Sequence, residues 1–325
     1  MRIKRYCKEY VFDVTEAPTA SVHASTVVKL KDGNVLAAWF GGTAEQGQDV
    51  RIWVSRRTQE GWEKPYKVES GVDEAHWNPV LFEKKSGEIC LYYKVGSEIK
   101  DWKTYVAVST DGGKSFSDSR ELVEGDVGGR GPVKNKPIYL SNGTLLAPAS
   151  DETTPAWFAF MDISEDDGNT WSKVVIQKPD EPYCGRPSTM IQPTLWEEPA
   201  GEVHALLRTN RGFAYRTDSK DFGKSWSTAY ITSVPNNNSG LDLVKVAGGK
   251  LALVSNPVQG HGGARTPLTL AFSHNNGLTF EKELTLEDNK GEYSYPSIVA
   301  DGNKLYITYT HQRKTSAFFE VELIL

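Results

Sequence analysis

The sequence contains few cysteines, and their placement excludes the structures that cysteines usually build. Cys7, Cys90 and Cys184 are the only three in 325 residues, and they lie far apart. An odd number at such distances argues against a disulfide framework and predicts a reducing compartment. The spacing matches no metal motif, so we expect no metal site and a role as small buried hydrophobic residues.

Long apolar runs and a basic charge excess are also missing. No stretch of 18 consecutive apolar residues occurs, so we expect no membrane-spanning helix. The charged start, Met-Arg-Ile-Lys-Arg-Tyr-Cys-Lys-Glu, has no apolar signal-peptide core, which predicts a cytoplasmic protein. The 37 basic and 42 acidic residues give a net charge of −5 and no reason to expect nucleic acid. No nucleotide-binding loop is present, so we expect no cofactor.

Helical periodicity is nearly absent, and a short motif recurs instead at an almost constant interval. Three copies read Ser-x-Asp-x-Gly-x-(Ser/Thr)-(Phe/Trp), and a fourth has Asn275 in the Asp place. Successive copies are 55, 55 and 54 residues apart and start at Ser109, Ser164, Ser219 and Ser273. A degenerate copy starts another 54 residues earlier, at Ser55. Such a repeat indicates an array in which each unit is one supersecondary element.

Six apolar hairpins share this period. In each, an alternating apolar strand leads to a turn that contains Gly or Asn, and a second apolar strand follows. The hairpins span Val22–Gly41, His76–Gly96, Val133–Asp151, Ile191–Asn210, Asn237–Pro257 and Tyr293–Gln312. Gly and Asn supply the positive φ angle of tight turns, and the flanking β-branched and aromatic residues favour strands. A third strand precedes each motif and a fourth follows it, so each period predicts four antiparallel strands.

Four-stranded units repeated radially form a β-propeller. The sequence therefore predicts an all-β fold, a six-bladed β-propeller of four-stranded antiparallel blades. The last unit ends with residues 317–325 and lacks an outer strand, which the N-terminal stretch Tyr6–Val14 can supply to close the ring. A closed ring is one domain despite its length, so we expect residues 1–325 to form a single domain.

The recurring motif is the Asp box, and the whole chain resembles the sialidase (neuraminidase) superfamily of six-bladed propellers. The resemblance implies that the boxes lie on the outer rim, where Asp or Asn and Ser side chains bond turn amides. It also implies a site at the ring centre. That site would hold three arginines on a sugar carboxylate, a tyrosine nucleophile paired with a glutamate, and an aspartate as acid and base.

Two arginines and a tyrosine of this sequence match that site. Arg208 and Arg265 look like the family's second and third arginines, which would grip a carboxylate through two-pronged hydrogen bonds. Tyr295 is similar to the nucleophilic tyrosine, and Tyr293 is its nearest rival. The resemblance therefore predicts a partner that is an acidic glycan.

Other positions are open or depart from the family pattern. Asp49 falls about where the acid/base aspartate lies, and Glu45 in the same glycine-rich loop is the alternative. His23 stands in place of the first arginine, and Thr310 in place of the glutamate that holds this arginine. Gln192 stands in place of the glutamate that supports the tyrosine. His23 can act as acid or base near neutral pH, whereas Gln192 can only form hydrogen bonds.

Further polar residues lie on the segments expected to face the ring centre. A purely structural centre would not need them, so they favour a ligand site. The ones we expect to contact the substrate are His76, Asn78, Arg130 and Lys136.

Three functions are compatible with these residues. The first, which we favour, is an exo-acting glycoside hydrolase on a terminal acidic sugar, with Tyr295 at the anomeric carbon. The second is a lyase or hydrolase acting at a uronic acid in rhamnose–glucuronate linkages, with His23 and Tyr295 as base and acid. The third is a non-catalytic propeller that binds glycans.

Overall fold

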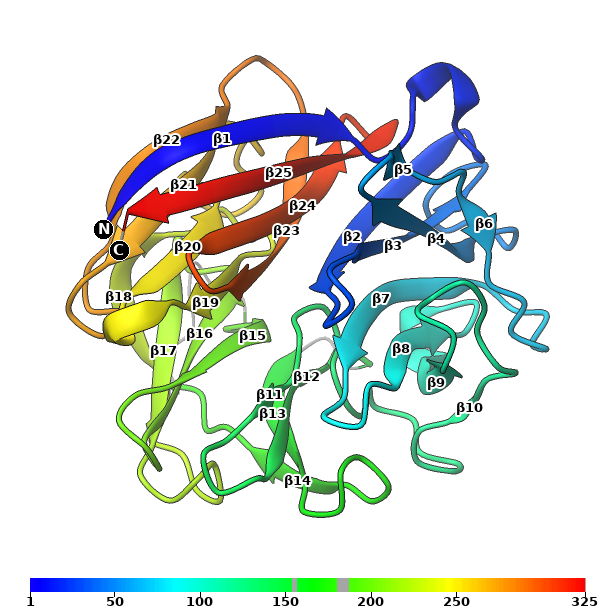
Figure 1. Ribbon diagram of the computed structural model, residues 1–325. Coiled ribbons are helices and arrows are strands. Elements are labelled where there is room, and N and C mark those ends of the chain that lie inside the picture. The colour runs from blue at the N-terminus through cyan, green and yellow to red at the C-terminus, as the bar shows by residue number, and fades with distance from the viewer. Residues whose placement is uncertain (154–156, 180–186, 325) are drawn as a thin grey trace.

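The computed structural model describes residues 1–153, 157–179 and 187–324, and there the chain forms six antiparallel sheets arranged as a ring (Figure 1). Each sheet is one blade, and the all-β six-bladed propeller predicted from the repeat is confirmed. Helix in these ranges is limited to the 3₁₀ turns η1 (Val14–Glu16), η2 (Ile99–Asp101) and η3 (Ala247–Gly249). None of these turns has the length and apolar character needed to span a bilayer.

Each blade is a meander that starts at the ring centre and ends at the rim. Blade 1 contains β2 (Ser21–Lys29), β3 (Val35–Gly42), β4 (Arg51–Thr58), β5 (Gly61–Trp62) and β6 (Tyr66–Lys67). Blade 2 contains β7 (His76–Glu83), β8 (Ile89–Val95), β9 (Lys103–Ser109) and β10 (Arg120–Glu121). Blade 3 contains β11 (Ile138–Tyr139), β12 (Leu145–Asp151), β13 (Phe158–Ser164) and β14 (Ser172–Val175).

The other half of the ring follows the same plan. Blade 4 contains β15 (Met190–Glu197), β16 (Val203–Thr209), β17 (Phe213–Ser219) and β18 (Tyr230–Pro235). Blade 5 contains β19 (Asp242–Lys245), β20 (Leu251–Ser255), β21 (Leu268–Ser273) and β22 (Glu281–Glu287). Blade 6 contains β23 (Tyr293–Asp301), β24 (Lys304–His311), β25 (Thr315–Ile324) and the N-terminal β1 (Arg2–Tyr10).

The N-terminal strand closes the ring, as predicted. β1 pairs antiparallel with β25, from Arg2 opposite Ile324 to Tyr10 opposite Ala317 (Figure 1). The strand begins and ends four residues before the predicted stretch Tyr6–Val14. Most of β1 is exposed, so its sequence lacks the apolar alternation that marks the boundaries of the inner strands.

The Asp boxes form the turns between the third and fourth strands, and their structural role is confirmed. In the first box, Ser109 Oγ donates to Asp111 Oδ1 at 2.7 Å and accepts from the Gly113 amide at 2.9 Å. The Asp111 carboxylate also accepts from the Ser115 amide and hydroxyl, at 3.1 and 2.6 Å. These bonds satisfy the turn's own backbone, which is what Asp and Ser side chains do in tight turns.

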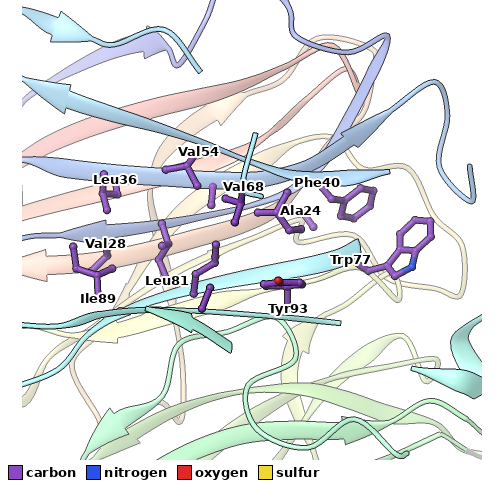
Figure 2. Close-up of a cluster of buried hydrophobic side chains, with 14 of the residues drawn as sticks. Ala24, Val28, Leu36, Phe40, Val54, Val68, Trp77, Leu81, Ile89 and Tyr93 are labelled. Carbon is purple, nitrogen blue, oxygen red and sulfur yellow. The ribbon is translucent and has the colours of Figure 1, made fainter. Parts of the chain in front are cut away.

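A buried apolar cluster fills the space between blades 1 and 2 (Figure 2). Val28 and Ile89 lie at one end of this cluster, and Phe40 and Trp77 lie at the other (Figure 2). All four side chains are at least nine-tenths buried. The aromatic end of the cluster forms part of the wall of the cavity described below.

The cysteines only partly follow the expectation of burial. Cys90 on β8 is a buried free thiol. Cys7 is free but exposed, because β1 is the outermost strand of its blade, so burial was wrong for this residue. Cys184 lies outside the described residues.

Candidate active site

Four inner strands carry the same distortion near the ring centre. In β2, β7, β15 and β23 the pairing with the next strand shifts register at a bulge. One residue in each bulge has a positive φ between 47° and 53°, namely Ala24, Asn78, Gln192 and Tyr295. Proline, which cannot donate a ladder hydrogen bond, follows the last three. Bulges re-aim side chains, and here Asn78, Gln192 and Tyr295 all line one central cavity.

The cavity has a volume of about 790 Å³. Its charged part contains Arg208, Arg265 and Arg313. The carboxylates that line it are those of Glu45, Glu98 and Glu152, and its aromatic wall includes Phe40, Trp77 and Trp102.

Two guanidinium groups surround the side chain of Tyr295. Arg208 Nη1 donates to the Tyr295 hydroxyl at 2.8 Å and to Gln192 Oε1 at 3.1 Å. Arg265 Nη1 donates to Glu292 Oε1 at 2.7 Å. The guanidinium carbons of Arg208 and Arg265 lie 5.7 and 5.6 Å from the centre of the Tyr295 ring. The structure therefore brings together the three residues that matched the family site.

A third guanidinium reaches the cavity from an element that the sequence analysis did not consider. Arg313 lies in the turn between β24 and β25, with a φ of 58°. Its Nε donates to Glu292 Oε1 at 2.8 Å, and its Nη1 donates to Glu45 Oε2 at 2.5 Å. Glu292 thus bridges Arg265 and Arg313. The sequence offered one signal for Arg313, namely its position three residues after Thr310 and directly after the last predicted hairpin.

His23, which stands in place of the family's first arginine, contacts Thr310, which stands in place of the glutamate that holds this arginine. His23 Nδ1 lies 3.0 Å from Thr310 Oγ1, and the imidazole centre lies 4.3 Å from the Tyr295 ring centre. His23 is 3% exposed. Burial, together with the charges of nearby arginines, holds the pKa of His23 well below its usual value. The imidazole is therefore neutral at neutral pH.

A glutamate that the sequence analysis missed, Glu152, lines the cavity together with Gln192. Glu152 follows the end of β12, and its Oε1 accepts from Ser150 Oγ at 2.9 Å. Burial raises the pKa of Glu152, against the opposing effects of Arg208 and of hydrogen bonds from Ser150 and Gln192. The cavity therefore contains a carboxyl group beside Gln192, the residue that stands in place of the glutamate of the family pattern. Glu152 escaped attention because it directly follows the predicted hairpin Val133–Asp151.

The structure places Asp49 outside the cavity lining, in contrast to the expectation for an acid/base group. Asp49 is exposed, and its Oδ2 accepts from the Thr43 amide at 2.8 Å and the Thr43 hydroxyl at 2.6 Å. These bonds fold the loop that carries Glu45, the acidic residue of this loop that does line the cavity.

Three further predicted contacts also lie outside the lining, and each of these side chains contacts a partner within the protein. His76 Nε2 lies 3.3 Å from Ser70 Oγ. Arg130 forms an ion pair with Asp162 at 2.9 Å, and Lys136 with Asp242 at 3.0 Å. Buried charges need such pairing, and a sequence pattern does not reveal whether the partner is internal or a ligand.

The segment before β11 supports the bulges from inside the ring. Lys134 Nζ donates to the carbonyl oxygens of Pro296 and Leu241, the latter at 3.3 Å. Asn135 Nδ2 donates to the carbonyl oxygens of Gln192 and Pro193 at 3.0 and 2.8 Å. Burial lowers the pKa of Lys134 to about 7. Because Pro296 follows Tyr295, this segment positions the backbone on which both Gln192 and Tyr295 are held.

The described residues offer no ready metal site. Nowhere in these ranges do three or more His, Cys, Asp or Glu side chains gather in a way that could hold a metal ion.

The fold and the cavity define a sialidase-like six-bladed propeller. Residues 33–307 match the model of the BNR repeat-like domain, and the chain belongs to this family. No curated protein sequence matches the chain.

Solved structures agree with this fold at low sequence identity. A Dyadobacter fermentans protein of unknown function has a TM-score of 0.75 at 17% identity, with 99% of both chains covered. The NanB sialidase of Streptococcus pneumoniae has a TM-score of 0.75 at 13% identity, covering 97% of this chain and 70% of that one. The intramolecular trans-sialidase of Ruminococcus gnavus has a TM-score of 0.69 at 13% identity, covering 97% and 96%. At these identities the likeness shows the shared fold alone.

Proposed function

We propose that this protein is an exo-acting glycoside hydrolase that removes a terminal sugar bearing a carboxylate. The observation that carries the proposal is the convergence of Arg208, Arg265 and Arg313 on the cavity that contains Tyr295. Guanidinium groups bind carboxylates through paired N–H donors, and lysine cannot match that geometry. The volume of about 790 Å³ also suits a small-molecule ligand.

In the proposed reaction, Tyr295 is the nucleophile. Its oxygen forms a bond to the anomeric carbon while the bond between that carbon and the leaving oxygen breaks. The phenol proton passes to Glu152, and the leaving oxygen takes a proton from Glu45. Water then adds its hydroxyl to the anomeric carbon and gives its proton to Glu45, while the bond between that carbon and Tyr295 breaks and the Tyr295 oxygen takes back the proton held by Glu152. The raised pKa of Glu152 supports its role, because proton transfer is most efficient when the pKa of the group lies near the working pH.

Binding of the substrate would prepare Glu45 for its role. In the free protein Glu45 is paired with Arg313. A substrate carboxylate that binds Arg313 would release Glu45 from this pair, so that Glu45 can face the leaving oxygen. Asp49, which we expected to be the acid, supports this arrangement by anchoring the loop through Thr43.

The experiment is an assay of the purified protein with a fluorogenic sialoside as the probe for a terminal acidic sugar. Release of free sialic acid is the expected result. Absence of release, together with breakdown of uronate oligosaccharides by the same preparation, would overturn the proposal.

One observation favours a second candidate, a lyase that acts at a uronic acid. His23 is neutral and packs against Tyr295, so a base and an acid lie side by side. In an elimination, His23 would remove the C5 proton, the bond between C4 and its oxygen would break, and Tyr295 would protonate that oxygen. The 4,5-unsaturated product absorbs in the near ultraviolet, unlike a hydrolysis product. This candidate fails if His23→Ala keeps activity while Tyr295→Phe loses it.

A further inference from the structure

Lys94, near the end of β8, is a buried charged residue that the proposed reaction does not use. It is 0% exposed and lies outside the lining of the cavity. Its Nζ donates to Thr104 Oγ1 at 2.6 Å and to the carbonyl oxygens of Gly129 and Arg130 at 3.0 and 2.9 Å. An ammonium group has three donors, so each of them has a partner, as a buried charge requires. Lys94 therefore holds two consecutive carbonyl groups of the connection between β10 and β11.

The same connection crosses from blade 2 to blade 3 (Figure 1), and it is fixed from blade 3 as well. The Arg130 guanidinium donates to both oxygens of Asp162 on β13, at 2.9 and 3.0 Å. The Gly131 amide donates to the same carboxylate, which is 0% exposed. Residues 129–131 are thus held between β8 and β13. Arg130, which we expected to contact the substrate, serves this internal link.

The glycine at position 129 brings this connection directly against the end of β12. Gly129 has a φ of 78°, and a Cβ atom there would lie 2.4 Å from the Ser150 carbonyl oxygen. No residue with a side chain can approach a carbonyl group so closely. The hydroxyl of the same Ser150 donates to Glu152 Oε1 at 2.9 Å. The contacts therefore run without a break from Lys94 through Gly129 and Ser150 to Glu152.

The charge of Lys94 also acts on Glu152. Burial raises the pKa of Glu152, and the charges of Arg208 and Lys94 both oppose this effect. A substrate carboxylate that binds Arg208 would offset the charge of that guanidinium, whereas Lys94 lies outside the lining and keeps its effect. Burial lowers the pKa of Lys94 to about 7, and the carboxylates of Asp162 and Glu152 counteract this lowering. Arg130 adds slightly to it.

We propose that Lys94 is a positioning residue for Glu152: it fixes Ser150 and Glu152 through Gly129, and its charge keeps the Glu152 carboxyl group ionised and ready to accept a proton. Lys94 does not touch the substrate, so it acts only through Glu152. The inference rests on the proposed function for the role of Glu152 as the proton acceptor. The link between the two residues does not depend on that role.

Titration of Glu152 tests this link without any substrate. The ¹³C signals of labelled glutamate side chains are followed by NMR from about pH 3 to about pH 8, a range around the ordinary glutamate pKa. The signal of Glu152 is the one that is missing in Glu152→Gln. In Lys94→Met we expect Glu152 to titrate at a higher pH than in the unmodified protein, because loss of a nearby cation disfavours the carboxylate. Lys304→Met, which removes the partner of Glu320 at the rim, is the matched control and should leave this titration unchanged.

Steady-state kinetics on the active substrate test the positioning. Lys94→Met should lower kcat about tenfold, since small displacements at the reacting centre slow the reaction. The acid limb of kcat/KM should move to higher pH together with the titration of Glu152, whereas a merely structural loss would leave this limb in place. Thr104→Val removes one acceptor of Lys94 but keeps its charge. It should lower kcat about threefold and leave the titration of Glu152 unchanged.

The outcomes separate this inference from the proposed function. If Glu152 titrates at the same pH in Lys94→Met and in the unmodified protein, the inference is wrong, even when the sialoside is hydrolysed. If the titration moves but the unmodified protein releases no sialic acid, the link between Lys94 and Glu152 stands and the proposed function fails. Thermal unfolding checks each variant. Lys94→Gln, whose amide can still donate to the two carbonyl groups, decides the matter if Lys94→Met does not fold.

Discussion

At the rim of the propeller the same turn is built repeatedly, whereas at the centre four inner strands present different side chains from the same kind of bulge. In the boxes of Asp111, Asp166 and Asp221, the carboxylate accepts from the hydroxyl four residues later at 2.6 Å each time. At the matching bulges of the centre stand Ala24, Asn78, Gln192 and Tyr295. The repeated groups serve the local fold, whereas three of the four varied residues, Asn78, Gln192 and Tyr295, line the cavity.

The largest expected contrast between centre and rim comes from Tyr295→Phe. This change removes only the hydroxyl, whose partner is Arg208. We expect kcat to fall roughly 10³-fold or more, because loss of a nucleophile removes a reaction step that no neighbour replaces. Steady-state kinetics on the active substrate, with circular dichroism as a check on folding, measures the effect.

Tyr293→Phe is the control for this change. The Tyr293 hydroxyl accepts from Gln312 at 2.9 Å and does not line the cavity. Equal losses in both variants would contradict the assignment of Tyr295 and restore Tyr293 as a candidate.

The next contrast compares two arginine–glutamate pairs, one at the centre of the ring and one at its rim. Arg313→Lys keeps the charge at the centre but loses the planar donors, and we expect KM to rise about 10–100-fold, equivalent to about 1.4–2.8 kcal/mol. At the rim, Arg57 pairs with Glu9 at 2.7 Å, and Arg57→Lys should leave KM unchanged, because this partly buried pair lies outside the cavity lining. If Arg313→Lys has the KM of the unmodified protein, Arg313 does not bind the substrate.

A smaller effect on rate, but a distinct effect of pH, is expected for Lys134→Met. Loss of the contact with Pro296 should lower kcat about tenfold by loosening the position of Tyr295, since small displacements at the reacting centre slow the reaction. The folded pKa of Lys134 is about 7, below its unfolded value of about 10.4. Between these values the unfolded chain binds more protons, so the free energy of unfolding rises with pH.

Chemical denaturation from pH 6 to about pH 9 measures this slope, within the range set by the two pKa values. Lys134→Met should flatten the rise. Lys94, which is also buried with a pKa of about 7, contributes in the same direction and remains in the variant. An unchanged slope in Lys134→Met would show that the ammonium group is not destabilised by burial.

The smallest effect on activity is expected at the Asp boxes. Asp221→Ala should lower the free energy of unfolding by about 1–2 kcal/mol, because the bonds from Ser219 and Ser225 are lost, and should leave kcat unchanged. Asp221→Asn should have a smaller effect, because Asn275 fills this place in the fourth box and accepts from the Thr279 amide at 3.0 Å. Thermal and denaturant unfolding rank the two variants, and a loss of kcat in either would contradict a purely structural role.

The effect of low pH on the contribution of Asp221 to stability follows from the direction of its pKa shift. Burial pushes the pKa of Asp221 upward, but the hydrogen bonds from Ser225 and Ser219 outweigh burial and lower it. A lowered folded pKa means that the carboxylate stabilises the fold at neutral pH and that this contribution is lost as the pH falls through the folded pKa. The difference between Asp221→Ala and the unmodified protein should therefore shrink in acid.

The sequence predicted the fold well because the repeat records it directly, through a turn motif that recurs, once in degenerate form, in five of the six periods. The resemblance to the sialidase superfamily, and not the repeat itself, predicted Arg208, Arg265 and Tyr295 as one site, and the repeat places the strands that carry or adjoin them in register. Arg313 and Glu152 escaped prediction because they lie in connections, where the repeat sets no register. Whether a charged residue points inward to an internal partner depends on contacts between blades that no periodicity encodes, as Arg130 with Asp162 shows.

The pairing of β1 with β25 has a consequence for how the molecule assembles. Arg2 meets Ile324, so these contacts span nearly the whole chain. The first strand leaves the ribosome long before its partner and must remain without it until the last blade has been made. Contacts at such separation are slow to form, since the chain entropy of closing the loop must be overcome first. The junction in blade 6 is therefore the step at which assembly competes with aggregation through the unpaired edge of β25.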